Sequence, residues 1–119
     1  MTSGILLSHT GELEWQELPG GFRHKFIAVG DRFLTGLGVA SPGGGETWHK
    51  HAPEVEETYY VLKGRGRMAW RSNGAEHTLE FSEGDSMYLP YGCENMFVNT
   101  GEGELVLLFN ITKADKMRE

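Results

Sequence analysis

The chain has 119 residues and a formal net charge of −6, with 11 Lys and Arg residues scattered along it. This length fits one domain with a single hydrophobic core, and an acidic balance without a basic stripe argues against nucleic-acid binding. The N-terminus lacks a basic flank and no apolar run is long, so we expect neither a signal peptide nor a membrane span. The single cysteine, Cys93, can form no disulfide within the chain, which favours the cytoplasm.

Short segments of alternating apolar and polar residues, separated by turn residues, predict an all-β chain with little or no helix. The predicted strands, in chain order, are residues 13–18, 22–29, 33–40, the segment that carries His49 and His51, 57–63, 67–71, 75–81, 86–89, 94–99 and 104–111. The tail, residues 112–119, is expected to form a short helix or to be frayed. Ten short strands at this spacing indicate an antiparallel β-sandwich or barrel.

Turn residues mark several of the boundaries between these strands. Asn73 and Gly74 match the two-residue type I′ hairpin turn, which requires a positive φ at both positions. The run from Pro42 to Gly45 is the strongest break in the chain, because proline and glycine interrupt regular structure. It precedes the segment that carries the candidate metal ligands.

His49 and His51 are the first candidate metal ligands. In a β-strand, residues i and i+2 point to the same face, so this spacing directs both imidazoles to one place. A carboxylate on the next strand would complete a set of two histidines and one carboxylate, which suits Fe(II) and other divalent transition metals. The alternative is that both histidines are exposed on an edge strand beside a solvated acidic turn.

The sequence also resembles the cupin superfamily, because both cupin motifs are present in the right order. The first motif is matched by Gly43, His49, His51, Glu57 and Gly64. The second motif is matched by Gly84, Pro90, Gly92, Asn95 and Asn99. The resemblance implies one cupin domain of the jelly-roll type over residues 1–119, with a core at about 22–111, an N-terminal arm at 1–21 and a tail at 112–119. It also implies a small-molecule ligand inside the barrel and a homodimer.

The glutamate of the first motif has two candidates. Five residues separate His51 from Glu57, where the family has three or four. Glu56 would fit a gap of four residues, but Glu57 keeps the six-residue spacing to Gly64. We therefore favour Glu57 and expect the extra residue to form a bulge in the turn before it.

Asn95 stands where the second cupin motif has a histidine. An amide oxygen binds hard cations but is a poorer ligand than imidazole for Fe or Zn. The resemblance therefore implies a divalent metal ion, Fe, Mn, Ni or Zn, held by His49, His51 and Glu57. Asn95 would be a weak fourth ligand or a hydrogen-bonding group beside the metal.

Further candidate residues follow from the alternation along the strands. Tyr59 shares the face of Glu57; it is either a general acid or base near the metal or a core aromatic with a satisfied hydroxyl group. Tyr60 and Leu62 point to the opposite face and would need a covering sheet or subunit. Cys93 is either a thiol ligand or, in our preferred interpretation, a small buried residue. The other expected pocket or core side chains are Trp48, Met68, Trp70, Met87, Phe97 and Phe109.

Two functions are compatible with these residues. The resemblance implies a metal-dependent enzyme that acts on an oxygen-containing small molecule, with dioxygenase, decarboxylase, isomerase or cyclase, or lyase chemistry. The alternative is a non-catalytic module that binds a small molecule or sugar, and Asn95 favours it. Retention of His49, His51 and Glu57 favours the enzyme, because a barrel used only for binding needs no such set.

Overall fold

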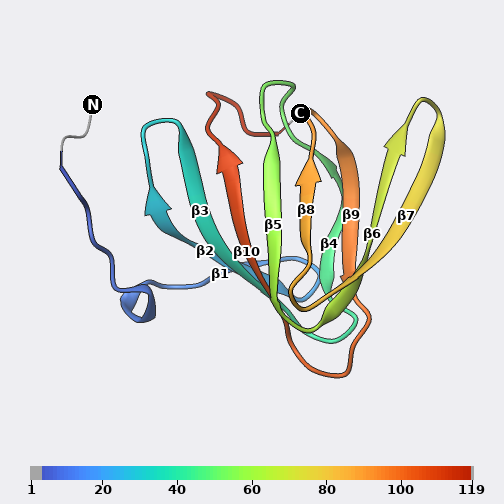
Figure 1. Cartoon of the computed structure of the whole chain (residues 1–119), viewed down its shortest axis with the longest axis horizontal. Coiled ribbons are helices and arrows are strands. Elements are labelled where there is room, and N and C mark those ends of the chain that lie inside the picture. The colour runs from blue at the N-terminus through green and yellow to red at the C-terminus, as the bar shows by residue number, and fades with distance from the viewer. Residues whose placement is uncertain (1–3, 119) are drawn as a thin grey trace.

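The computed structural model describes residues 4–118, which form two antiparallel β-sheets that face each other (Figure 1). Within these residues the strands are β1 (Gln16–Leu18), β2 (Phe22–Val29), β3 (Phe33–Ala40), β4 (Gly45–Lys50), β5 (Glu57–Lys63), β6 (Arg65–Ser72), β7 (Ala75–Ser82), β8 (Ser86–Leu89), β9 (Glu94–Asn99) and β10 (Leu105–Thr112). The larger sheet has the order β1-β2-β3-β10-β5-β8, and the smaller has the order β4-β9-β6-β7. The predicted all-β antiparallel sandwich or barrel is confirmed.

The core lies between the two sheets, where every second residue of the inner strands points. Along β10, Leu105, Leu107, Phe109 and Ile111 are buried, and the residues between them are more exposed. On the opposite sheet, Phe97 of β9 is 1% exposed. A period of two with one apolar face buried is the pattern of sheets packed face to face.

Two glycines of β3 let large rings approach its backbone. A Cβ atom at Gly36 would lie 2.2 Å from Cζ of Phe109, and one at Gly38 would lie 2.6 Å from Cζ of Phe22. Both distances are shorter than real Cβ contacts, so a side chain at either position would force the ring or the strand to move. The rings of Phe22 and Phe109 thereby occupy the inner face of β3.

The turn predicted at Asn73 and Gly74 is confirmed by its backbone. Both residues have positive φ angles, 53° and 76° respectively, as the type I′ turn requires. The turn joins β6 and β7 into a hairpin whose register runs from Arg65↔Ser82 to Ser72↔Ala75. In Figure 1 this hairpin extends away from the larger sheet.

The predictions for the two ends of the chain were wrong. The first strand begins at Gln16 rather than at residue 13, because Leu13 closes a 3-10 turn, η1 (Thr10–Glu12), through a hydrogen bond from its N–H to the carbonyl of Thr10. The tail is not helical over residues 113–118. It runs back along the barrel, where Arg118 forms a β-bridge with His51.

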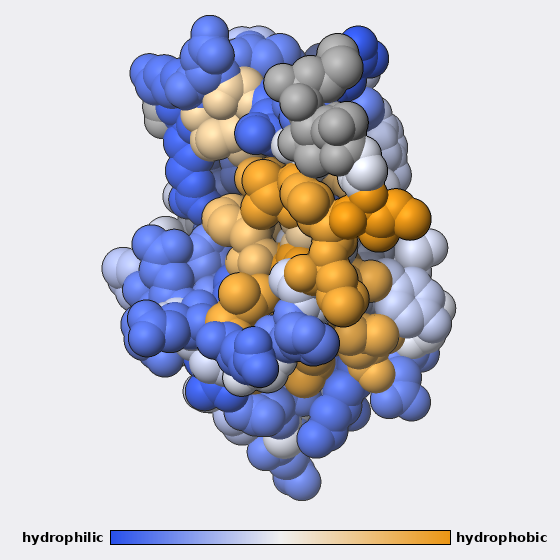
Figure 2. Space-filling view, turned by 90° about the vertical axis from the view of Figure 1, so that its left-hand side faces the viewer, coloured by the Kyte–Doolittle hydropathy of each residue, from blue (hydrophilic) through white to orange (hydrophobic). Residues whose placement is uncertain are grey.

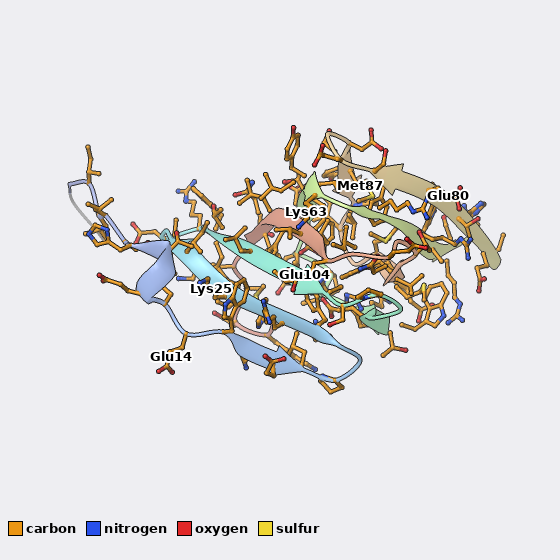
Figure 3. The ribbon with its side chains drawn as sticks, turned by 90° about the horizontal axis from the view of Figure 1, so that it is seen from below. Glu14, Lys25, Lys63, Glu80, Met87 and Glu104 are labelled. Carbon is orange, nitrogen blue, oxygen red and sulfur yellow. The ribbon has the colours of Figure 1, made fainter. Side chains whose placement is uncertain are left out.

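An exposed apolar surface covers part of the N-terminal segment and the adjoining strands (Figure 2). Its large exposed side chains are Ile5, Leu6, Leu7, Phe26, Val29 and Phe33. Beside it, Lys25 of β2 is only 8% exposed and donates to the carbonyl of Thr10 at 2.8 Å (Figure 3). This contact holds the N-terminal segment against the sheet. Residues 4–118 contain no helix of the length and apolarity that a membrane crossing demands.

Candidate metal centre and adjoining cavity

His49 lies near the end of β4, and His51 follows directly after the strand. Their ring centroids are 5.2 Å apart, and the rings are nearly perpendicular at 83°. The His49 side chain is 7% exposed and that of His51 is 11% exposed. The two imidazoles are therefore neighbours inside the barrel, not surface side chains.

Backbone carbonyls hold the two rings in the same tautomer. Nδ1 of His49 lies 2.8 Å from the carbonyl oxygen of Thr47, and Nδ1 of His51 lies 3.3 Å from that of Met117. A carbonyl can only accept a hydrogen bond, so each Nδ1 carries the proton and each Nε2 presents a lone pair. Histidines that bind metals are commonly oriented in this way.

Glu57, and not Glu56, faces the histidines. Glu57 is 5% exposed, and its Oε1 lies 3.3 Å from Nε2 of His51. The carboxylate of Glu56 instead accepts hydrogen bonds from the hydroxyl groups of Tyr88, at 2.5 Å, and Tyr91, at 3.2 Å. The bond to Glu56 is the main reason that the pKa of Tyr88 rises to about 12.

Asn95 of β9 is fully buried and lies in register with His49 of β4. Its amide group donates to the carbonyl of Cys93 at 3.0 Å, which directs Oδ1 the other way. Oδ1 has no hydrogen-bond partner in the described chain. A buried amide oxygen is thus left free in the place of the cupin histidine.

Buried polar atoms without a hydrogen-bond partner lie together around the two histidines. Four buried side-chain nitrogen or oxygen atoms of the described residues lack a hydrogen-bond partner, and three of them are Nε2 of His49, Oε1 of Glu57 and Oδ1 of Asn95. An unsatisfied buried polar group costs about 1–3 kcal/mol, so such groups usually mark a bound water or ion. Nitrogen and oxygen atoms of these types fit a divalent transition metal.

The ligand atoms do not yet surround a common point. Within residues 4–118, no three His, Cys, Asp or Glu side chains are arranged closely enough to hold a metal ion. Of the candidate ligands, His51 and Glu57 are in contact. The residue types nevertheless fit a divalent transition metal.

Glu46 and Arg118 also reach the centre, and the sequence did not indicate either of them. Arg118 donates to Oε2 of Glu46 at 2.7 Å, and the same oxygen lies 3.7 Å from Nδ1 of His49. Residues i and i+3 of a regular strand point to opposite faces, but the register of β4 shifts between Glu46 and His49. This irregularity turns Glu46 toward the histidine.

Tyr59 is 3% exposed and packs edge-on against the ring of Phe97 at 6.0 Å. Burial raises the pKa of Tyr59 well above its ordinary value, and the charges of Glu57 and Glu46 and a hydrogen bond to Glu57 add to the effect. The hydroxyl group is therefore protonated beside Glu57. It is placed to donate a hydrogen bond within the centre.

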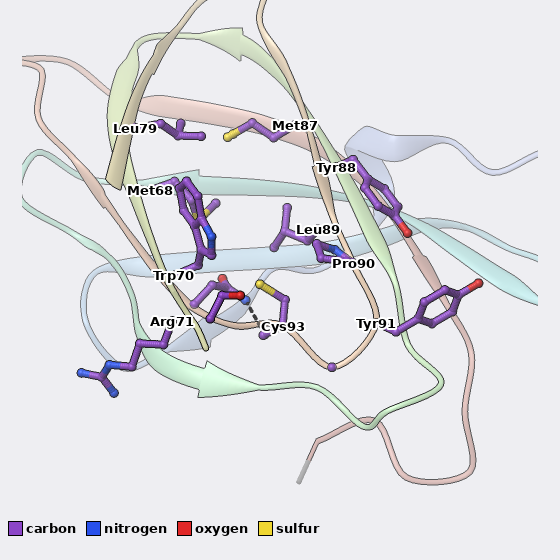
Figure 4. Close-up of a pocket in the computed structure, with 13 residues that line it drawn as sticks. Met68, Trp70, Arg71, Leu79, Met87, Tyr88, Leu89, Pro90, Tyr91 and Cys93 are labelled. Carbon is purple, nitrogen blue, oxygen red and sulfur yellow. Dashed lines mark hydrogen bonds between the residues drawn. The ribbon is translucent and has the colours of Figure 1, made fainter. Parts of the chain in front are cut away.

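A cavity of about 410 Å³ adjoins the centre between β8 and the β6–β7 hairpin (Figure 4). Of the expected pocket residues, it is lined by Met68, Trp70 and Met87, and Asn95 lines it as well. It is also lined by Leu79, Leu89, Tyr91 and Cys93, which sequence analysis had not assigned to a pocket.

The other expected pocket residues lie elsewhere. Phe97 and Phe109 are buried in the core, at 1% and 5% exposure, and do not line the cavity. The ring of Trp48 is covered by the guanidinium group of Arg71 at 3.8 Å. Cys93 is partly buried, and burial raises the pKa of its thiol, so the thiol is protonated in this environment.

Two facing antiparallel sheets with a polar cluster from β4, β5 and β9 between them define a jelly-roll barrel of the kind that encloses a small-molecule site. The family model of the cupin domain matches residues 36–111, and the chain belongs to this family. No curated protein matches the chain.

Solved structures of several cupins are similar to this one. The polyketide cyclase RemF from Streptomyces resistomycificus is 20% identical with a TM-score of 0.77, and the match covers 98% of this chain and 85% of that chain. KdgF from Halomonas sp. is 20% identical with a TM-score of 0.74, and the match covers 94% of this chain and 97% of that chain. These two likenesses show the fold alone.

A mutant of the oxalate decarboxylase from Bacillus subtilis is 28% identical with a TM-score of 0.73. The match covers 89% of this chain but only 29% of the decarboxylase. Another structure of that enzyme, 28% identical, concerns its Mn(II) centres. The chain thus corresponds to less than a third of this relative.

Proposed function

We propose that the protein is a metal-dependent cupin enzyme that acts on an oxygen-containing small molecule. The observation that carries the proposal is the cluster of buried atoms without a hydrogen-bond partner, Nε2 of His49, Oε1 of Glu57 and Oδ1 of Asn95. His51 completes the set, since its Nε2 faces Glu57. These residues would hold a divalent ion of Fe, Mn, Ni or Zn, with Asn95 as the weakest ligand.

The residues around the ion have separate tasks. When bound, the metal would supply Lewis-acid or redox chemistry at a substrate oxygen atom. The carbonyl groups of Thr47 and Met117 keep the two imidazoles in the tautomer that binds a metal. Tyr59 is our candidate catalytic acid or base, because its buried hydroxyl group lies next to Glu57, and its raised pKa favours the acid.

The reaction class stays open among dioxygenation, decarboxylation, isomerisation or cyclisation, and elimination. The structural relatives include a polyketide cyclase and an oxalate decarboxylase. A small dianion such as oxalate fits less well, because Arg71 is the one charged side chain among the described residues that line the cavity. Its guanidinium group is already paired with Glu76 and Glu94.

Elemental analysis of untagged protein tests the proposal. We expect near-stoichiometric metal in the wild type and little in His49→Ala and His51→Ala, while His9→Ala, which changes an exposed histidine, keeps the wild-type content. A folded wild type that stays empty after incubation with Fe(II), Mn(II), Ni(II) and Zn(II) would contradict the metalloenzyme.

A non-catalytic binding module is the second candidate function. Asn95 favours it, because an amide replaces the imidazole that the family uses at this position. The cavity beside Asn95 would then hold a small molecule or sugar without turnover. Ligand binding to a protein that takes up no metal, with the ligand recovered unchanged, would support this alternative.

A second copy of the chain is the proposed protein partner. The exposed apolar side chains around Phe26, Val29 and Phe33 form a surface of the kind that a subunit covers. Light scattering should give the mass of a dimer, and Phe33→Glu should lower it. We expect no nucleic-acid or membrane partner because the chain is acidic, and the cytoplasm is the proposed compartment because Cys93 has no cysteine to pair with.

A further inference from the structure

The cavity beside Asn95 has a lining that limits what can occupy it. Its walls carry two thioethers, Met68 and Met87, two leucines, Leu79 and Leu89, and the indole of Trp70. Figure 4 shows Leu79 and Met87 facing each other at one end of the cavity, with Trp70 and Met68 along one side. Its volume of about 410 Å³ lies in the ordinary range of pockets for drug-sized molecules.

The charged side chain of the cavity wall, Arg71, is already paired with carboxylates. Arg71 lines the cavity, but it points away from the other lining side chains in Figure 4. Its guanidinium group lies 3.4 Å from Glu94, 3.6 Å from Glu76 and over the ring of Trp48. A charged ligand would lose its hydration without gaining a counter-ion, which is costly.

The aromatic and sulfur-containing side chains favour a flat ligand. One face of the Trp70 indole is stacked with His77 at 5.3 Å and 24°, so the ring is held in a fixed plane while it lines the cavity. Thioether sulfur atoms make favourable contacts with aromatic rings. Met68 and Met87 would therefore pack well against a planar ring system.

Asn95 offers a hydrogen-bond acceptor that would fix the orientation of a bound ligand. It is fully buried, it lines the cavity, and its Oδ1 has no hydrogen-bond partner in the described chain. An amide oxygen only accepts hydrogen bonds, so it selects a ligand with a donor, such as a hydroxyl group. It has two lone pairs, so one can accept from the ligand while the other faces the metal. The hydroxyl group would then lie at the side of the cavity that adjoins His49, the strand neighbour of Asn95.

We propose that the cavity binds an uncharged, fused-ring aromatic molecule with its hydroxyl group directed at Asn95. The statement that such a molecule is the substrate rests on the proposed function. The binding itself depends on the cavity alone and can be measured in protein from which metal has been removed.

Calorimetry with three related probes tests the ligand chemistry. In metal-free wild type we expect saturable binding of 2-naphthol, at one molecule per chain. 2-Methoxynaphthalene has the same rings without a donor and should bind about threefold to tenfold more weakly, the effect of one lost hydrogen bond. Naphthalene-2-sulfonate, which is always charged, should bind at least about tenfold more weakly, and malonate should not bind. Equal affinity for the three ring probes, or no binding of 2-naphthol, would overturn the proposal.

A matched pair of variants tests the location. Leu79 and Leu62 are strand leucines of similar exposure, 37% and 42%, and only Leu79 lines the cavity. Leu79→Glu should weaken 2-naphthol binding at least about tenfold by placing a charge in the wall, and Leu62→Glu should leave it unchanged. Equal effects of the two variants would overturn the assignment to this cavity.

The metal content separates this proposal from the proposed function. Binding of 2-naphthol to this cavity, in a protein that takes up no metal under any condition, overturns the enzyme and leaves the ligand class standing. A protein that takes up metal but binds no 2-naphthol overturns the ligand class and leaves the metal centre standing.

Discussion

Oε1 of Glu57 lies 3.3 Å from Nε2 of His51, and this carboxylate oxygen has no hydrogen-bond partner in the described chain. Because Nδ1 of His51 is turned to the carbonyl of Met117, two lone pairs face each other across this distance. Such a contact needs a proton or a cation between the two atoms. A proton would make this contact an ion pair, and the metal ion that we propose would take the place of that proton.

Glu57→Gln should lower the affinity for a divalent metal at least about 100-fold, because it removes the negative charge of the ligand set. Titration calorimetry with Mn(II) or Zn(II) measures the change. Glu56→Gln is the matched control, since Glu56 is bonded to Tyr88 and Tyr91 instead. Equal losses in the two variants would show that Glu57 is not a ligand.

Asn95→His should raise the affinity for Zn(II) or Ni(II) about tenfold or more, because imidazole is the better ligand. The cavity beside Asn95 gives the larger ring space. Asn95→Leu, which removes the ligand atom, should not show the gain. An unchanged affinity in Asn95→His would mean that this side chain does not reach the metal.

Deletion of the last three residues should lower metal affinity about tenfold, the usual effect of losing a group that orients a metal ligand. It removes the carbonyl of Met117, which accepts hydrogen bonds from Nδ1 of His51 and from the N–H of Ala52. Arg118→Ala keeps this carbonyl and should cause a smaller loss. Long-range ¹⁵N NMR of metal-free protein should show His51 protonated at Nδ1 in the wild type and in Arg118→Ala, but not in the truncated protein.

Gly36→Ala should destabilise the protein by about 1–3 kcal/mol, since the new methyl group would overlap the ring of Phe109. Gly103→Ala is the control, because nothing lies within 4 Å of the position its Cβ would take. Urea unfolding measures both variants. Similar stabilities would show that β3 shifts readily to admit a side chain.

Acid should weaken the fold through His24. Burial is the main cause that lowers the pKa of His24 below 6.5, so the unfolded chain binds the proton more readily and stability falls as pH drops from about 6.5 toward the folded-state pKa. His24→Gln should lose less stability than the wild type between pH 7.5 and 5.5 in urea unfolding. His9→Gln, at an exposed position, should behave like the wild type.

The alternation of residues within single strands was predictable, and contacts between distant segments were not. Burial of Glu57, Tyr59 and Val61, with Tyr60 and Leu62 exposed, follows the predicted period of two. The same rule places Trp48 on the face opposite to its neighbour His49, so its assignment to the pocket did not follow from the alternation.

The rest of the centre depends on geometry that no local pattern encodes. Glu46 reaches His49 only because the register of β4 shifts between them. Met117 and Arg118 reach it because the tail returns over more than sixty residues of sequence to His51. Loop closure of that length is decided by tertiary packing and not by local propensity.

The cavity opens between β7 and β8, which are outer strands of different sheets. In residues 4–118 no ladder of backbone hydrogen bonds joins β7 to β8, whereas β6 is paired with β9 on its other side. Side chains therefore form this side of the cavity wall. Substitutions of these side chains can reshape the entrance without removing a backbone hydrogen bond of either sheet.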